Sequence, residues 1–117
     1  MSTNEPPRSN AAIVRASVDA YHRQDIETAS RFLADDFIFT SPQDDHIGKA
    51  AYLERCFPTA DRFVTSEILA LVPAGDDSVL MLYEYELTTG ERYRNTEYIT
   101  LRDGRLVETQ VFFGGRV

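Results

Sequence analysis

The sequence has one cysteine and no long apolar run, and each scarcity excludes a class of protein. Cys56 alone cannot form an intrachain disulfide, which fits a reducing compartment. No stretch approaches the roughly 20 apolar residues of a membrane-spanning helix. The first residues also lack the apolar segment of a signal peptide. We therefore expect a cytoplasmic protein that does not contact a membrane.

Basic residues are also scarce, with 12 Lys and Arg against 19 Asp and Glu and a net charge of −7. Nucleic acid requires a basic surface for its phosphates, so we expect no nucleic-acid partner. The sequence has no glycine-rich phosphate loop, and His46 has no further metal ligands at a suitable spacing. We expect neither a cofactor nor a metal.

The first half of the chain has the spacing of helices. Residues 1–9 are expected to be a frayed tail and residues 10–117 a single domain. Ser9 or Asn10 can cap a first helix, and Asp25 can cap a second. A short strand is predicted over 37–40. A third helix is predicted over 48–57, and the proline that follows, Pro58, ends it.

The second half has the alternation of strands. Four strand-like runs cover 63–72, 78–87, 92–101 and 106–114, and short connections join them. The pair Asp103-Gly104 is a strong signal of a tight hairpin. Short connections force neighbouring strands to be antiparallel, so we expect a meander. Helices followed by strands predict an α+β domain with the helices on one face of the sheet.

Glu97 is the most informative residue, because its strand places it on the apolar face. Ile99 and Leu101 share its side of the strand, whereas Arg94 and Arg102 lie on the other. A carboxyl group on an apolar face must find hydrogen bonds, take up a proton or face a cavity. Glu97 is therefore either a proton donor or acceptor in a pocket, or a structural carboxylate that no ligand reaches.

The same alternation predicts a mostly apolar, aromatic pocket wall. Tyr83 is the residue best placed to act beside Glu97, although such tyrosines are more often core residues. Asn95 either orients Glu97 or binds ligand, or it is a polar side chain that only fills space. Apolar residues on the opposite face (Leu82, Tyr98 and Phe112) predict a homodimer through that face. The predicted ligand-binding residues are Tyr21, Phe39, Ser41, Phe57, Tyr85, Asn95, Thr109, Val111 and Phe113.

His46 is the histidine nearest the expected mouth of the pocket. Its ordinary pKa near 6.5 suits acid–base chemistry, so it is a catalytic candidate with Glu97 and Tyr83. The alternative is that residues 44–46 form a solvated loop. Ser41 has no activating partner in the sequence, so we interpret it as a hydroxyl of a loop and not as a catalytic base.

Three motifs carry a resemblance to a known family. They are residues 19–27 between the first two helices, residues 32–37 before the first strand, and the C-terminal run 102–114. With this order of elements, residues 10–115 resemble the SnoaL-like, ketosteroid isomerase-like branch of the NTF2-like superfamily. The resemblance implies a dimeric, cone-shaped domain with three N-terminal helices on a strongly curved antiparallel sheet.

The resemblance also implies a chemistry. Matched motif by motif, the base of a ketosteroid isomerase falls on Ser41, its oxyanion-hole tyrosine on Ser17 and its protonated aspartate on Glu97. Of these three functional groups, this sequence keeps only the carboxyl donor, at Glu97. Our first hypothesis is an isomerase or cyclase that binds a small hydrophobic carbonyl compound and uses Glu97 in proton transfer. The alternative is a non-catalytic ligand-binding or dimerisation module.

Overall fold

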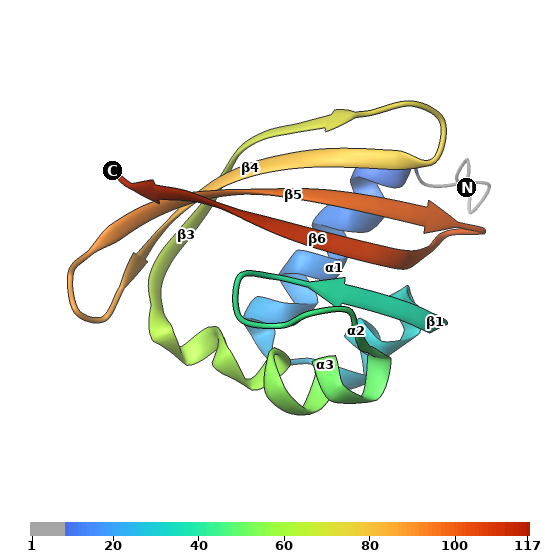
Figure 1. The fold of residues 1–117 in the computed structure, drawn as a ribbon, viewed down its shortest axis with the longest axis horizontal. Coiled ribbons are helices and arrows are strands. Elements are labelled where there is room, and N and C mark those ends of the chain that lie inside the picture. Colours follow the sequence, from blue (N-terminus) through green and yellow to red (C-terminus); the bar gives the residue numbers. More distant parts are fainter. Residues whose placement is uncertain (1–8) are drawn as a thin grey trace, which may run out of the picture.

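A computed structural model describes residues 9–117, which form three α-helices, one 3₁₀-helix and one six-stranded sheet. The predicted α+β class is confirmed, and Figure 1 shows the arrangement. The helices are α1 (Asn10–Arg23), α2 (Ile26–Phe32), α3 (Lys49–Arg55) and the 3₁₀-helix η1 (Phe57–Arg62). The strands are β1 (Leu33–Thr40), β2 (Ile47–Gly48), β3 (Phe63–Pro73), β4 (Ser78–Leu87), β5 (Arg92–Arg102) and β6 (Arg105–Arg116).

The first two helices begin at side-chain caps. The hydroxyl of Ser9 accepts a hydrogen bond from the backbone N–H of Ala12 at 3.1 Å, and the carboxylate of Asp25 accepts one from Thr28 at 3.2 Å. Both predicted caps are confirmed. The predicted frayed tail, residues 1–9, lies outside the described residues except for Ser9, which is the cap of α1.

The third helix and the first strand differ from their predicted bounds. The third helix ends at Arg55, and Pro58 lies in the first turn of η1 and does not simply stop the chain. Proline fits this position because the first turn of a helix leaves its N–H groups unpaired. The first strand begins at Leu33, four residues before the predicted strand.

The sheet is mixed, so the prediction of an antiparallel sheet was wrong in one part. The strand order is β2-β1-β6-β5-β4-β3. The last four strands form the predicted antiparallel meander, but β1 pairs with β6 in parallel, with Phe39 beside Thr109. Short loops force antiparallel pairing only between consecutive strands. Strands β2 to β5 lie between β1 and β6 in the sequence, so no short loop joins this pair.

The predicted strong curvature of the sheet was also wrong. Figure 1 shows long, twisted strands that are not strongly curled. Strong bends arise at β-bulges, where one strand carries an extra residue. The central pair β4–β5 keeps an unbroken register from Ser78 opposite Thr100 to Glu86 opposite Arg92, so no bulge bends it.

The hairpin between β5 and β6 has the predicted two-residue turn. Asp103 and Gly104 both have positive φ angles, 54° and 77°, and Arg102 pairs with Arg105 on either side. Positive φ at both central positions is the geometry that an Asp-Gly pair favours. Beyond this turn the register shifts by one residue between Leu101 and Thr100, and the shifted register sets Glu97 beside Val111.

The helices pack against one face of the sheet, and the main core lies between these layers (Figure 1). Phe37, Val79 and Ile99 are nearly inaccessible to solvent in this core, which closes one end of the layer. A second cluster, Ala20, Ala29 and Phe57, joins α1, α2 and η1. Within residues 9–117, no helix has both the length and the apolar character needed to cross a membrane.

Replacing Ile99 with alanine is predicted to lower the free energy of unfolding by about 2–5 kcal/mol, because it removes buried methyl groups and leaves a void. Ile99 is 1% exposed, whereas Ile26 is 49% exposed on α2. The matched change Ile26→Ala should alter the free energy by less than about 0.5 kcal/mol. Urea denaturation measures both, and equal losses would contradict the assigned core.

Candidate functional site

A cavity of about 740 Å³ lies between the helices and the inner face of the sheet. Its volume is within the range of small-molecule sites, about 300–1,000 Å³. The sheet contributes two adjacent rows of side chains, Met81–Glu97–Val111 and Tyr83–Asn95–Phe113, because paired residues on neighbouring strands point to the same face. The predicted site residues that line the cavity are Tyr21, Phe39, Ser41, Tyr83, Tyr85, Asn95, Glu97, Thr109, Val111 and Phe113.

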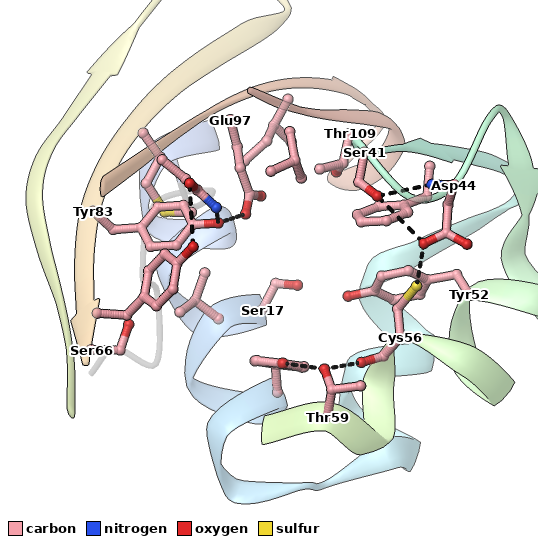
Figure 2. A pocket seen from close by; sticks show the side chains of 18 of the residues that line it. Ser17, Ser41, Asp44, Tyr52, Cys56, Thr59, Ser66, Tyr83, Glu97 and Thr109 are labelled. Carbon is pink, nitrogen blue, oxygen red and sulfur yellow. Dashed lines mark hydrogen bonds between the residues drawn. The ribbon is translucent and has the colours of Figure 1, made fainter. Parts of the chain in front are cut away.

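Glu97 projects from β5 into this cavity, beside Tyr83 (Figure 2). The Tyr83 hydroxyl donates a hydrogen bond to Glu97 Oε2 at 2.8 Å. Glu97 Oε1 has no hydrogen-bond partner among residues 9–117. Burial raises the pKa of Glu97 from 4.5 to about 7, and the hydrogen bond from Tyr83 opposes part of that rise. A large fraction of the carboxyl groups is therefore protonated at neutral pH.

Three further polar groups on the sheet form a chain that ends at Glu97. The Tyr85 hydroxyl donates to Asn95 Oδ1 at 3.4 Å, and Asn95 Nδ2 donates to the Tyr83 hydroxyl at 3.3 Å. Burial raises the pKa of both tyrosines, so both phenols stay protonated. Asn95 therefore bonds to Tyr83 and Tyr85 and makes no direct hydrogen bond to Glu97.

His46 and Phe57 are the predicted site residues that do not line the cavity. The His46 side chain is 67% exposed and pairs with Asp45 at 2.5 Å, with its backbone at a φ of 51°. The loop turns it outward, away from Glu97, as expected of a solvated loop. Phe57 is buried in the second cluster with Ala20 and Ala29, where it joins two helices to η1.

Asp44 is the main residue of the cavity that the sequence analysis missed. Its side chain is 17% exposed and faces the cavity from the wall opposite Glu97 (Figure 2). A closed turn holds it there. Ser41 and Asp44 exchange backbone hydrogen bonds, and the Ser41 hydroxyl accepts from the N–H groups of Gln43 and Asp44 at 3.2 Å each. A serine followed by proline and an aspartate three residues on is a turn signal that could have indicated this geometry.

The carboxylate of Asp44 has only long contacts to the protein. Ser41 Oγ lies 3.4 Å and Cys56 Sγ 3.5 Å from Asp44 Oδ2, and Arg55 lies 3.7 Å from the other oxygen. Hydrogen bonds to a carboxylate are strong near 2.8 Å, so these contacts leave its oxygens available to a ligand. Burial and the nearby Asp44 raise the pKa of Cys56 to about 11, so this thiol stays protonated and is a poor nucleophile.

The remaining walls are mostly aromatic. Tyr21 on α1 bonds through its hydroxyl to Thr59 at 2.9 Å, and Tyr52 on α3 packs against Phe37 and Phe39. Tyr52 also lines the cavity and was not predicted. In the part of the chain that the structure describes, no three His, Cys, Asp or Glu side chains gather as a metal-ligand group. The arrangement suits binding of an apolar molecule, with the carboxyl groups of Asp44 and Glu97 on separate walls of the cavity.

The raised pKa of Glu97 predicts how stability depends on pH. Between pH 4.5 and about 7 the folded protein keeps a proton that the unfolded chain releases. The contribution of Glu97 to stability is therefore full below pH 4.5 and is lost as the pH rises through 7, a change of up to about 3 kcal/mol. Denaturation of the wild type and of Glu97→Gln from pH 4 to pH 8 measures this difference.

Tyr83→Phe is the matched control for that titration. It removes the hydrogen bond that lowers the pKa of Glu97, so the pH at which stability is lost should move upward. A difference between wild type and Glu97→Gln that stays constant with pH would contradict a buried, protonated Glu97.

The match to a known family is extensive. The sequence model of the SnoaL-like domain family matches residues 14–109 of this chain. These residues include every side chain of the Tyr85–Asn95–Tyr83–Glu97 chain and the turn that carries Asp44. None of the curated protein sequences compared with this chain matches it.

Several solved structures share the fold. A protein from Kribbella flavida is 22% identical, with a TM-score of 0.79 over 88% of this chain and 84% of its own. An NTF2-like protein from Burkholderia thailandensis is 21% identical, with a TM-score of 0.72 over 91% of each chain.

A protein from Rhodopseudomonas palustris with the provisional name isomerase has the same identity and TM-score, 21% and 0.72, over 92% of this chain and 91% of its own. Identities this low carry the fold alone. The fold is therefore NTF2-like, and the family match over residues 14–109 shows that the chain belongs to the SnoaL-like domain family.

Proposed function

We propose that this protein binds a small, mostly apolar carbonyl compound in the cavity and catalyses an isomerisation or cyclisation by proton transfer. Aromatic and aliphatic side chains supply most of the lining, and polar groups gather at a few points. Such a lining favours an apolar ligand whose orientation a few hydrogen bonds fix. The observation that carries the proposal is the protonated Glu97 beside Tyr83 inside this lining.

Glu97 would act on the carbonyl oxygen of the ligand, and Tyr83 would hold it in place. A protonated Glu97 can donate through the oxygen that Tyr83 does not contact, while the Tyr83 phenol donates its one hydrogen to the other oxygen. Donors fixed in an apolar site stabilise the negative charge that develops on a carbonyl oxygen, because little reorganisation is needed. Their effect is largest in the enolate-like transition state.

Asp44 would supply the base that the sequence analysis did not find. Its carboxylate takes a proton from the carbon next to the carbonyl, and the electron pair of that C–H bond moves to form an enolate. Glu97 stabilises the enolate oxygen. Asp44 then returns the same proton to another carbon, which moves the double bond with no net gain or loss of atoms or electrons. Its position on the wall opposite Glu97 supports this role.

The provisional name isomerase of the similar protein from Rhodopseudomonas palustris fits this reaction class. The proposal depends on the side chains of this chain and not on that name, because identity of 21% carries only the fold.

A panel of β,γ-unsaturated cyclic ketones tests the proposal, since the conjugated product absorbs in the ultraviolet. Glu97→Gln should lower kcat by about 100-fold or more and change ligand affinity by less than about threefold, because the amide keeps the shape but cannot transfer a proton. Asp44→Asn should lower kcat by about 100-fold or more, because the amide cannot take the proton from carbon.

Asp45→Asn is the matched control, because the Asp45 side chain is 93% exposed and lies outside the cavity. Its kcat should equal that of the wild type within about twofold. Ketone binding without turnover in the wild type would favour a non-catalytic binding module. Full turnover in Glu97→Gln would contradict the role of Glu97.

We also propose that the outer face of the sheet forms a homodimer. Leu80, Leu82, Tyr98 and Phe112 lie on adjacent strands of this face, and Phe112 is 54% exposed. Ion pairs of Arg92 and Arg94 with Glu84 border this apolar strip. An apolar strip with a charged border is typical of a protein–protein contact.

Phe112→Glu should convert the dimer to a monomer, because it would bury a charge at the contact. Light scattering with size-exclusion chromatography measures the mass. Val64→Glu, at an exposed position on β3, is the control and should leave the dimer intact. A wild-type chain that is monomeric at micromolar concentration would exclude this surface as a stable interface.

A further inference from the structure

Within residues 9–117 the hydroxyl of Tyr52 has no protein partner, unlike those of three other tyrosines that line the cavity. Tyr21 bonds to Thr59, Tyr83 to Glu97 and Tyr85 to Asn95. Among residues 9–117 no group bonds to the Tyr52 hydroxyl, which projects into the cavity (Figure 2). Tyr52 is half-buried, and a phenol in an apolar wall normally finds a hydrogen-bond partner, so its hydroxyl is available to a group that enters the cavity.

The ring of Tyr52 is held firmly, so its hydroxyl has a fixed position. Its centroid lies 5.3 Å from that of Phe37 and 4.8 Å from that of Phe39, and both phenylalanines belong to β1. Burial raises the pKa of Tyr52, so the phenol keeps its proton and acts as a donor. A fixed, protonated donor in an apolar wall is suited to an oxygen acceptor.

Ser17 adds a second hydroxyl to the same region. It lies on α1 and points into the cavity near Tyr52, across from Glu97 in Figure 2. Its hydroxyl also lacks a hydrogen-bond partner within the described part of the chain. The cavity therefore has two separate polar regions, Tyr83–Glu97 on the sheet and Tyr52–Ser17 on the helices, with apolar side chains between them.

We propose that the ligand carries a second oxygen acceptor, which Tyr52 and Ser17 bind while its carbonyl meets Glu97. This inference rests on the proposed carbonyl site and names the substrate class more closely. The substrate is a bifunctional compound with an apolar middle and an oxygen at each end, such as a cyclic diketone or hydroxyketone. A monoketone of the same skeleton leaves the Tyr52 hydroxyl unpaired and binds less tightly.

Matched probes test this directly. The monoketone 2-decalone and a set of decalin diones, which carry the second carbonyl at different ring positions, are titrated against the protein by NMR. We expect at least one dione to bind about tenfold more tightly than 2-decalone, as one hydrogen bond to a buried donor implies. Tyr52→Phe should remove this preference and leave the affinity for 2-decalone within twofold of the wild type.

Tyr98→Phe is the matched control, since it removes a tyrosine hydroxyl on the outer face of the sheet, outside the cavity. The preference for the dione should survive in it. Thermal unfolding gives a second readout: Tyr52→Phe should not lower the Tm, because its hydroxyl makes no bond to the described protein. A drop in Tm of several degrees would show a structural role for the hydroxyl and overturn the proposal.

The outcomes separate this inference from the proposed function. If 2-decalone binds but no dione binds more tightly, or Tyr52→Phe keeps the preference, only the second oxygen site is wrong. If neither the monoketone nor any dione binds, the carbonyl site and the second oxygen site both fail.

Discussion

The hydrogen bond between Tyr83 and Glu97 is the interaction on which the chemistry of the cavity depends. It holds a carboxyl group in an apolar environment that favours its neutral form, and burial outweighs the opposing effect of the bond itself. Tyr85 and Asn95 fix the tyrosine in turn. The sheet thus presents a proton donor whose position is set by four connected side chains.

The opposite wall has a different character, because its polar groups are only loosely engaged with the protein. Asp44 makes long contacts to Ser41 and Cys56, and the Tyr52 hydroxyl makes none to the described residues. Loosely engaged groups keep their hydrogen-bonding capacity for a ligand. A fixed donor facing an available base and hydroxyls is an arrangement that can bind a carbonyl compound and move one of its protons.

Strand alternation made the sheet side of this site predictable, and the loop side was not predictable in the same way. The period of two placed Tyr83, Asn95 and Glu97 on the inner face, and the unbroken pairing of β4 with β5 sets their register. Asp44 depends on a turn closed by a serine hydroxyl, whose direction no periodicity sets. The parallel pairing of β1 with β6 is a contact between distant segments, so local pattern predicted the strand but not its direction.

The most direct measurement is an NMR titration of the Glu97 side-chain carboxyl, with Glu97→Gln to assign its signal. A buried, protonated donor should titrate near 7, as burial in the cavity implies. A pKa at or below the ordinary value of 4.5 would mean a solvated or ion-paired carboxylate. That result would contradict Glu97 as the acid of this site and leave the cavity as a binding pocket.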